Sequence, residues 1–404
     1  MNLTRREFLR DAAAAGVLCS SWPCVARGER KVKIERIESF PMVYPVIGRF
    51  KFFEGPKGQP QGRAAVVVKI TADNGMVGWG QSVPIPKWSY ETIESVHYTV
   101  TRYLAPELIG QDPFDLDAIN AIMSRVIAPS FSTGQPICKA GLDLALFDLT
   151  GRLLNQSAAQ RWGLKARDTI TLSWTLNPRT LDDLEALIAQ GTGRGYKNFN
   201  VKIAPDPKFD LEMCRIVKRR VPNGFLWADA NGGYDEKTAL EVAPKLADIG
   251  VPVLEQPLPA NRLNGYRRLK KQGALPIIMD EGVVSVEDLQ EFIELQLLDG
   301  VAMKPARCGG ITGARNQIEL LHKHKLMFLG SGLTDPDIAL AASLILYGAY
   351  DLSYPAALNG PQFLQGSILK DPFKGVDGQL RVPTGVGLGV EVDESKIGEF
   401  SVKV

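Results

Sequence analysis

Five charged residues in the second half of the chain recur at a nearly constant interval. They are Lys202, Asp229, Glu255, Asp280 and Lys304, separated by 27, 26, 25 and 24 residues. Each closes a short apolar run rich in strand-forming residues and precedes a turn and a helix-like segment, so the interval is that of one strand-plus-helix unit. The carboxyl ends of consecutive parallel strands meet on one rim of a sheet. The pattern therefore predicts two amines and three carboxylates gathered at one site.

Strand-like and helix-like segments alternate from residue 169 onward. Eight apolar runs, separated by seven helical stretches, predict a (β/α)7β barrel of the TIM type in an α/β protein, with residues 136–360 as the catalytic domain. The runs are TITLSWTL, FNVKI, FLWADA, VPVLEQ, PIIMDE, GVAMKP, LMFLGS and YPAALN. An open doubly wound sheet is the alternative. That fold needs a glycine-rich phosphate turn after its first strand, and LSWTLNP has none.

An accessory domain precedes the predicted barrel. A strand-like alternation covers residues 31–43, and the apolar runs on either side of an Asn-Gly pair at residue 74 predict a β-hairpin, because Asn-Gly is a favoured two-residue loop. Helical patterns follow at residues 90–108 and 116–127. Residues 31–135 are therefore expected to form an N-terminal α+β capping domain.

Two further segments connect to these domains. The segment 136–154 is helical and apolar on almost all sides, which predicts burial between two layers. Asp143 and Asp148 lie within it and are expected to be hydrogen-bonded buried carboxylates rather than ligands, since no other reactive group is near them in sequence. Residues 361–404 are too long for a barrel helix and too apolar for a disordered tail, so we expect them to return to the capping domain.

Composition excludes several classes of partner. The chain of 404 residues has a formal net charge of +2 without a basic or acidic block, which argues against nucleic acid and anionic membranes. No apolar stretch reaches the roughly 20 residues that span a bilayer. The five cysteines lack C-x-x-C spacing, which argues against a disulfide framework or a thiolate metal site. A small-molecule substrate is expected, and the composition is compatible with a homo-oligomer.

The first 26 residues are similar to a twin-arginine export signal. Paired arginines in TRREFLR precede an Ala-rich apolar segment, and Cys24-Val25-Ala26 provides a small-x-Ala cleavage site. A basic, frayed N-terminus is the alternative. The signal predicts that residues 1–26 are removed and that the mature protein is periplasmic.

The three regularly spaced acids suggest a metal site. Asp229, Glu255 and Asp280 fall on strands three, four and five without clustered His or Cys, and oxygen-only donors suit a hard divalent cation. Mg²⁺ is the expected cofactor, and Mn²⁺ could substitute. A single acid at a strand end often only caps the next helix, but capping does not require three acids in register.

The two lysines flank the acids on strands two and six. Around a barrel these positions face each other across the mouth, so one bound carbon could have an amine on each side. Burial beside a divalent cation disfavours the charged form of a lysine and makes it a better base. The alternative is that Lys202 and Lys304 are salt-bridge residues that neutralise the acids.

The motifs resemble those of the enolase superfamily, specifically the muconate-lactonizing-enzyme subgroup of the mandelate racemase/muconate lactonizing enzyme family. The resemblance rests on the order KI, DANGGY, LEQP, DEG and KP with Gly309-Gly310 following. It extends to WGQSVP, KAGLDLALFDLTGRLL and TGVGLGVEVDE and so covers nearly all of the chain after the leader. It implies Mg²⁺ bound by the three acids, with Lys202 and Lys304 as an opposed acid/base pair. It also implies that Asn231 and Glu281 stand beside the ligands and orient them.

The family chemistry implies removal of the proton α to a substrate carboxylate, with an enolate stabilised by the metal. Reprotonation gives racemisation or epimerisation, and ring opening or closing gives cycloisomerisation. We therefore expect a racemase, epimerase or cycloisomerase of a small carboxylate. The alternatives are a dehydratase that eliminates a β-substituent and a catalytically impaired protein that binds metal and carboxylate. Schiff-base aldol cleavage would leave the three acids unexplained.

The chain departs from the subgroup pattern at several positions. The usual K-x-K of strand two is Asn200-Val201-Lys202, so like-charge repulsion cannot strengthen Lys202 as a base. No histidine follows a strand end. Strand eight carries Asn359 where dipeptide epimerases have D-x-D, and Thr334 stands where an acid is common after strand seven. Lys304 is therefore the more secure catalytic residue, and Lys202 is expected to be a weaker base or a cationic stabiliser.

Substrate contacts are expected from strand ends and from cap loops. The strand-end candidates are Asn200, Ser331 and Asn359. The cap candidates are Arg49, Phe52, Phe53, Lys57, Trp88 and Tyr90, although mobile surface residues would have the same composition. Of these, Arg49 and Lys57 would suit a second anionic group.

Overall fold

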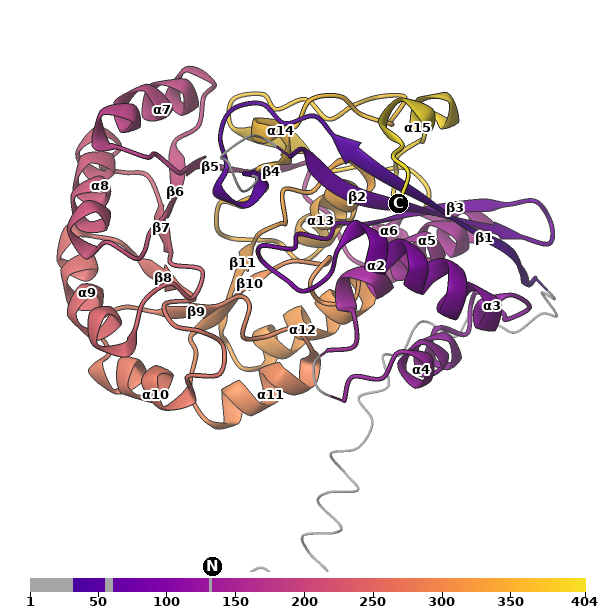
Figure 1. Cartoon of the computed structure of the whole chain (residues 1–404), viewed down its shortest axis with the longest axis horizontal. Helices are drawn as coiled ribbons and strands as arrows, with labels where there is room; N and C mark the ends of the chain where they lie inside the picture. The colour runs from indigo at the N-terminus through magenta and orange to yellow at the C-terminus, as the bar shows by residue number, and fades with distance from the viewer. Residues whose placement is uncertain (1–31, 55–60, 131–132) are drawn as a thin grey trace, which may run out of the picture. The chain divides into compact units, whose positions relative to one another are not determined.

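The computed structural model describes residues 32–54, 61–130 and 133–404 (Figure 1). The predicted export signal and Lys57 lie outside these residues. From Val32 onward the chain forms one compact unit. Within the described ranges, no helix has the length and apolar character needed to cross a membrane.

A three-stranded antiparallel sheet forms the centre of the cap, in the order β1-β2-β3. Its hairpin turns at the predicted Asn-Gly pair, where Gly75 takes φ +82°, a conformation that favours glycine. The strands are β1 (Ile34–Tyr44), β2 (Arg63–Ala72) and β3 (Val77–Ser82). The remaining cap elements are η1 (Lys51–Phe53), α2 (Ile93–Tyr98), η2 (Thr99–Leu104), α3 (Ala105–Leu108) and α4 (Leu116–Val126).

Helix α5 (Pro136–Leu154) packs on the cap sheet, although the sequence placed it at the start of the barrel domain. Gly80 of β3 permits the close approach, because an added Cβ there would collide with the α5 backbone. Asp148 accepts hydrogen bonds from the amides of Trp79 (3.0 Å) and Leu388 (2.9 Å), and Asp143 accepts one from the amide of Thr312 (3.2 Å). Both acids are thus hydrogen-bonded buried carboxylates, as predicted.

Seven parallel strands form the barrel sheet in the sequential order β5 to β11. The strands are β5 (Ser173–Leu176), β6 (Asn198–Lys202), β7 (Leu226–Asp229), β8 (Val253–Glu255), β9 (Ile277–Met279), β10 (Gly300–Met303) and β11 (Met327–Gly330). Figure 1 shows helices along the outer side of these strands. They are α7 (Leu181–Gly193), α8 (Pro207–Arg220), α9 (Glu236–Ile249), α10 (Leu263–Gln272), α11 (Val286–Glu294), α12 (Ile311–Lys323) and α13 (Asp337–Ala349).

The eighth predicted strand is reduced to two residues that close the barrel. Ala356 forms a parallel bridge with Leu172, and Ala357 forms one with Ser331. Pro355, which precedes the two bridged residues, has no amide hydrogen to donate and so limits pairing on that side. The single turn α14 (Gly360–Phe363) follows in place of an eighth full helix. The (β/α)7β barrel with an N-terminal cap is thereby confirmed.

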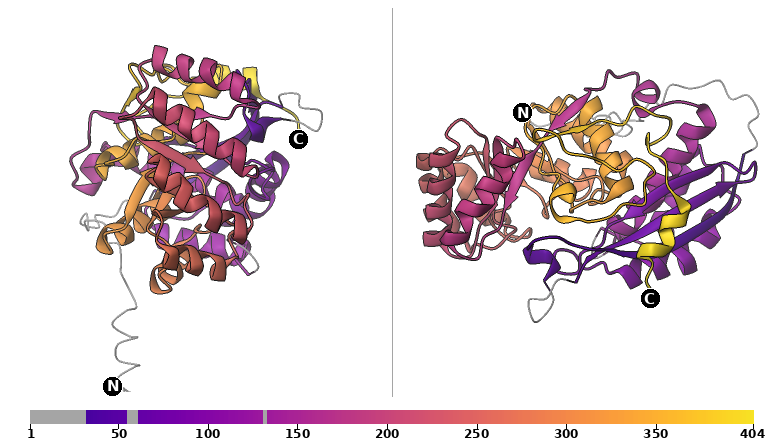
Figure 2. Two further views of the ribbon diagram at one scale, coloured as in Figure 1. Left: turned by 90° about the vertical axis from the view of Figure 1, so that its left-hand side faces the viewer. Right: turned by 90° about the horizontal axis from the view of Figure 1, so that it is seen from above.

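The C-terminal segment returns across both parts of the molecule (Figure 2). Strand β12 (Gln379–Arg381) pairs with β4 (Thr169–Thr171), which follows the short helix α6 (Ala158–Trp162). Helix α15 (Glu394–Phe400) lies beside the cap, where Ser401 bridges Met42 of β1. The segment therefore contacts the barrel as well as the cap.

Candidate active site

The five periodic residues meet at the carboxyl ends of five adjacent strands. Lys202 is paired with Asp229 across β6 and β7, and Asp229 is paired with Glu255 across β7 and β8. Asp280 directly follows β9, and Lys304 directly follows β10. Strand register alone thus places three acids and two amines on one rim.

The three acids have the chemistry of a metal site. One oxygen from each of Asp229, Glu255 and Asp280 lies within 4.8 Å of the other two, and all three side chains are buried. Glu255 Oε1 has no hydrogen-bond partner in the described part of the chain. Burial and the neighbouring charge of Asp229 raise the pKa of Glu255. Three close, buried carboxylates without clustered His or Cys fit a hard divalent cation such as Mg²⁺ or Mn²⁺.

Lys202 is held by one carboxylate. Its Nζ lies 2.5 Å from Asp229 Oδ2. Burial works to lower the pKa of Lys202, but the negative charges of Asp229 and Glu255 outweigh burial and raise it. The surrounding carboxylates therefore favour the charged form of Lys202.

Lys304 has more partners than Lys202. Its Nζ contacts Asp280 Oδ2, lies 3.6 Å from Glu255 Oε1 and stands 5.4 Å from the centre of the Trp88 ring. Only 4% of the residue is exposed. The cap therefore covers this amine directly through Trp88.

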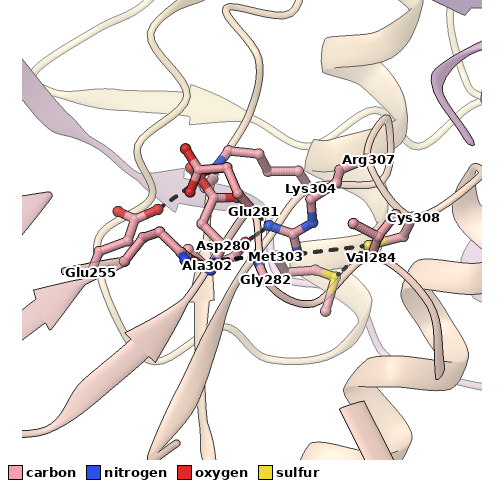
Figure 3. A network of polar contacts seen from close by, with 12 residues as sticks. Glu255, Asp280, Glu281, Gly282, Val284, Ala302, Met303, Lys304, Arg307 and Cys308 are labelled. Carbon is pink, nitrogen blue, oxygen red and sulfur yellow. Dashed lines mark hydrogen bonds and ion pairs between the residues drawn. The ribbon is translucent and has the colours of Figure 1, made fainter. Parts of the chain in front are cut away.

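Arg307 anchors the other oxygen of Asp280, and the sequence analysis missed it. Figure 3 shows Arg307 and Lys304 both directed at Asp280. Arg307 Nη1 contacts Asp280 Oδ1 and donates to the carbonyl of Ala302 (2.9 Å), while Nη2 lies 3.8 Å from Cys308 Sγ. The only signal in the sequence was a second cation in KPARCGG, three residues after Lys304.

Asn231 and Glu281 lie beside the three acids, the arrangement that the resemblance implies. Asn231 Nδ2 donates to Asp229 Oδ2 and to Glu281 Oε1, each at 3.2 Å. Its backbone takes φ +44°, a left-handed conformation that Asn adopts more readily than most residues. Burial, followed by the charges of Asp280 and Asp229, raises the pKa of Glu281 to about 8.

Gln256 supports Asp280 from behind and was also missed. Gln256 Oε1 accepts from the amides of Asp280 (2.9 Å) and Gly282 (3.1 Å), and its Nε2 donates to the carbonyl of Leu258 (2.8 Å). The side chain is fully buried. In LEQP the glutamine is therefore a positioning residue rather than a spacer.

A cavity joins the lysines to five of the nine predicted substrate residues, Phe52 among them. Asn200, Ser331, Asn359 and Trp88 line it together with Lys202, Asn231, Asp280 and Lys304. Phe50, Phe52 and Ile85 of the cap cover it. Its free volume is about 20 Å³, room for about one water molecule. A substrate larger than water therefore requires side chains that line the cavity to move.

Asn200 belongs to a neutral hydrogen-bond network. Its Oδ1 accepts from the hydroxyls of Ser173 (3.1 Å) and Thr175 (3.0 Å), and Asn359 Nδ2 donates to Thr175 Oγ1 (3.2 Å). The network fills the space beside Lys202 with uncharged groups. No second strand-two amine is present to repel the Lys202 ammonium.

Arg49 lies outside this cavity. Its Nε is 2.6 Å from Glu54 Oε1, and Nη1 donates to the carbonyl of Asn177 (2.7 Å). It lines a neighbouring cavity of about 620 Å³ instead. Of the remaining cap candidates, Phe53 is buried and Tyr90 is 55% exposed and accepts from the amide of Gln135.

Lys51 is a cap residue whose charge interacts with Lys202 of the site. Burial, and then the positive charge of Lys202, lowers the pKa of Lys51. In the described ranges no carboxylate lies within ion-pair distance of it. Its sequence context gives no signal of this role, because a lone lysine in a loop is typical of a solvated surface charge.

The chain is similar to known proteins over most of its length. Residues 183–396 match the family described as "Enolase C-terminal domain-like", and residues 58–163 match "Mandelate racemase / muconate lactonizing enzyme, N-terminal domain". A chloromuconate cycloisomerase of Delftia acidovorans is 32% identical over 342 residues, which cover 83% of this chain and 91% of the relative. An N-succinyl-L-Arg/Lys racemase of Bacillus cereus is 26% identical over 347 residues, covering 84% and 90%.

The chain is also similar in fold to a solved structure of this family. The muconate lactonizing enzyme of Pseudomonas fluorescens, in complex with muconolactone, superposes with a TM-score of 0.84 at 26% identity. The match covers 92% of this chain and all of the other. The likeness therefore includes the cap as well as the barrel.

Proposed function

This chain belongs to the mandelate racemase/muconate lactonizing enzyme family of the enolase superfamily, and we propose that it is a Mg²⁺-dependent cycloisomerase of a small unsaturated carboxylate. It is an enzyme of the isomerase class, like its relatives. The observation that carries the proposal is one cavity lined by two lysines of unequal surroundings beside three buried carboxylates. Cycloisomerisation moves one proton at one carbon and so needs only one well-placed acid/base group.

The reaction is written for muconate as the probe. A substrate carboxylate oxygen bonds to an alkene carbon, and the displaced electron pair moves to the carbon α to the other carboxylate. Lys304 donates a proton to that carbon and becomes a neutral amine; in the reverse direction the amine removes the same proton. A divalent cation bound by Asp229, Glu255 and Asp280 would supply positive charge that stabilises the enolate.

The other residues of the site supply charge, hold the acids in place and exclude water. Lys202, which is cationic beside Asp229, adds a second positive charge on the opposite side of the cavity. Asn231 and Gln256 hold Asp229 and Asp280 in place. Phe50, Phe52 and Trp88 exclude water from the enolate, which would otherwise be protonated from solvent.

Racemisation is the second candidate function. It requires an acid/base group on each face of the α-carbon, and both Lys202 and Lys304 line the same cavity. The similarity to an N-succinyl-L-Arg/Lys racemase supports trying N-blocked amino acids as substrates.

One experiment separates these functions. The protein loaded with Mg²⁺ is incubated in D₂O with muconate, with chloromuconate and with N-succinyl-L-arginine, and the α-proton is followed by NMR. Lactone formation with one deuterium at the α-carbon supports cycloisomerisation, and exchange with inversion supports racemisation. Loss of a β-substituent would identify a dehydratase, and binding without exchange would identify an impaired binding protein. Exchange that survives EDTA, or that survives loss of both lysines, would contradict the mechanism.

We also propose that the protein is exported folded to the periplasm. The support is the twin-arginine motif TRREFLR followed by a small-x-Ala site. Cell fractionation of the full chain should find it in the periplasm, and the double change Arg5→Lys, Arg6→Lys should retain it in the cytoplasm. Recovery of both the wild type and the double variant from the periplasm would contradict export through the twin-arginine signal.

A further inference from the structure

Arg63, the first residue of β2, is a fully buried cation with an unusual set of partners. Its exposed fraction is 0%, and its guanidinium donates only to backbone carbonyls. In the described part of the chain, no carboxylate lies within ion-pair distance of it. Burial lowers the pKa of Arg63 to about 9, and the negative charge of Asp335 opposes that change.

The hydrogen bonds of Arg63 join two loops that come from different domains. Nη1 donates to the carbonyl of Pro84 (2.7 Å) and Nη2 to that of Val83 (2.8 Å), both at the end of cap strand β3. Nε donates to the carbonyls of Leu333 (3.0 Å) and Thr334 (3.3 Å), which follow barrel strand β11. One side chain therefore ties the cap to the barrel.

Both loops form walls of the candidate active site. Leu333 and Thr334 line the cavity directly. On the cap side, Ile85 and Trp88 line it, and Ile85 is the residue after Pro84. Trp88 is the ring that covers Lys304, so a shift of this loop would uncover the amine.

Burying a charge without a paired carboxylate is costly, and an apolar side chain of similar size would often be more stable. A planar fork with five donors, however, fixes several carbonyls at once in a way that lysine or an apolar residue cannot. A costly group at the junction of two cavity walls indicates a requirement for position rather than for stability.

We propose that Arg63 is a positioning residue that locks the β3 loop of the cap to the β11 loop of the barrel and thereby sets the shape of the closed substrate cavity. It touches neither the proposed metal ligands nor the lysines. Its loss should therefore weaken productive substrate binding and leave the metal site intact.

The test compares Arg63→Lys and Arg63→Met with Arg161→Met. Arg161 is a matched control, because it is also buried (4% exposed) and donates to a backbone carbonyl, that of Phe147 in α5, away from the cavity. With the substrate found in the D₂O panel, Arg63→Met should lower kcat/KM by about 100-fold, mainly through KM, as expected for misplaced contacts. The kcat/KM of Arg63→Lys should lie between those of wild type and Arg63→Met. Mg²⁺ affinity, measured by calorimetry, should change less than about 3-fold in all variants.

A second readout does not depend on the proposed reaction. Hydrogen exchange followed by mass spectrometry should show faster exchange in both segments 83–90 and 331–336 of Arg63→Lys, and in neither segment of Arg161→Met. Should Arg63→Met fail to fold, Arg63→Lys carries both measurements. A folded Arg63 variant with unchanged exchange in the two segments would overturn the proposal, as would one with kcat/KM within about 3-fold of wild type. If no substrate is found, the exchange result still decides it, so failure of the proposed function and failure of this inference are distinguishable.

Discussion

The two lysines of the site differ in how firmly the surrounding chain holds them. Lys304 contacts two carboxylates and lies under Trp88, and its partner Asp280 is fixed by Arg307 and Gln256. Lys202 has one close carboxylate, Asp229. A cavity with two amines is therefore not symmetrical, and we infer that the well-supported side carries the proton transfer while the other side supplies charge.

The largest expected effect is that of Lys304→Ala. Loss of the proposed acid/base group should reduce α-proton exchange by about 10⁴-fold, the upper end for general acid–base catalysis. The measurement is the deuterium incorporation rate by NMR at saturating Mg²⁺. Retention of more than a tenth of the rate would show that another group moves the proton.

The matched change Lys202→Ala should be milder. A residue that only stabilises charge is expected to contribute about 10²-fold, less than the group that transfers the proton. The same NMR assay measures it. Equal losses for the two lysines would break the comparison and favour the racemase mechanism, in which both act as bases.

Metal affinity provides a test that does not require turnover. Arg307→Met removes the anchor of Asp280 Oδ1 and should weaken Mg²⁺ binding by roughly 10- to 100-fold, the range for residues that orient ligands. Calorimetric titration measures this change. Arg315→Met, on the outer helix α12, serves as the control and should leave affinity unchanged. Equal affinities of Arg307→Met and wild type would mean that Asp280 is positioned without Arg307.

The smallest expected effect is on the pH dependence of stability, through Asp210, which lies close to Lys202 in the sequence. Asp210 accepts from the amide of Ala204 (2.9 Å), just beyond Lys202, and from the hydroxyl of Tyr234 (2.6 Å). Burial raises the pKa of Asp210 from 3.8 to about 6. The folded state thus holds this proton more tightly than the unfolded chain does. Its contribution to stability is fully present below about pH 4 and is lost as pH rises through about 6.

Thermal melting between pH 4 and 7 checks this prediction. Asp210→Asn should melt with a shallower pH dependence than wild type over that window, while the exposed control Asp182→Asn should follow wild type. Because other carboxylates titrate in the same range, the difference between the two curves is the quantity to compare. Parallel curves for wild type and Asp210→Asn would contradict the raised pKa.

The sequence predicted the reacting groups better than their surroundings. Asp229, Glu255 and Asp280 were accessible because parallel strands repeat at a fixed interval and place their ends together. Arg307 could not be predicted, because its contact with Asp280 depends on the turn that follows Lys304. Periodicity contains no information about such a turn.

The contacts of loop residues were harder still to predict from the sequence. Arg49 was a reasonable candidate to bind an anionic group of the substrate, but it donates hydrogen bonds to Glu54 and Asn177 instead. Those partners could not be inferred from spacing. Helix α5 is apolar on almost all sides, which predicted burial between two layers, and the structure places it between the cap sheet and α12. Strand eight was predicted at full length, and the structure keeps only the pairing of Ala356 and Ala357.

The partners of Arg63 have a consequence for how this molecule can change over generations. Every amino acid carries the same carbonyl oxygen, so the clasp recognises the path of the main chain and is indifferent to the side chains at positions 83, 84, 333 and 334. Mutations at positions 333 and 334, which line the cavity, can therefore reshape its wall without removing the hydrogen bonds between cap and barrel. Such an arrangement leaves room for new substrate preferences to arise on an unchanged frame.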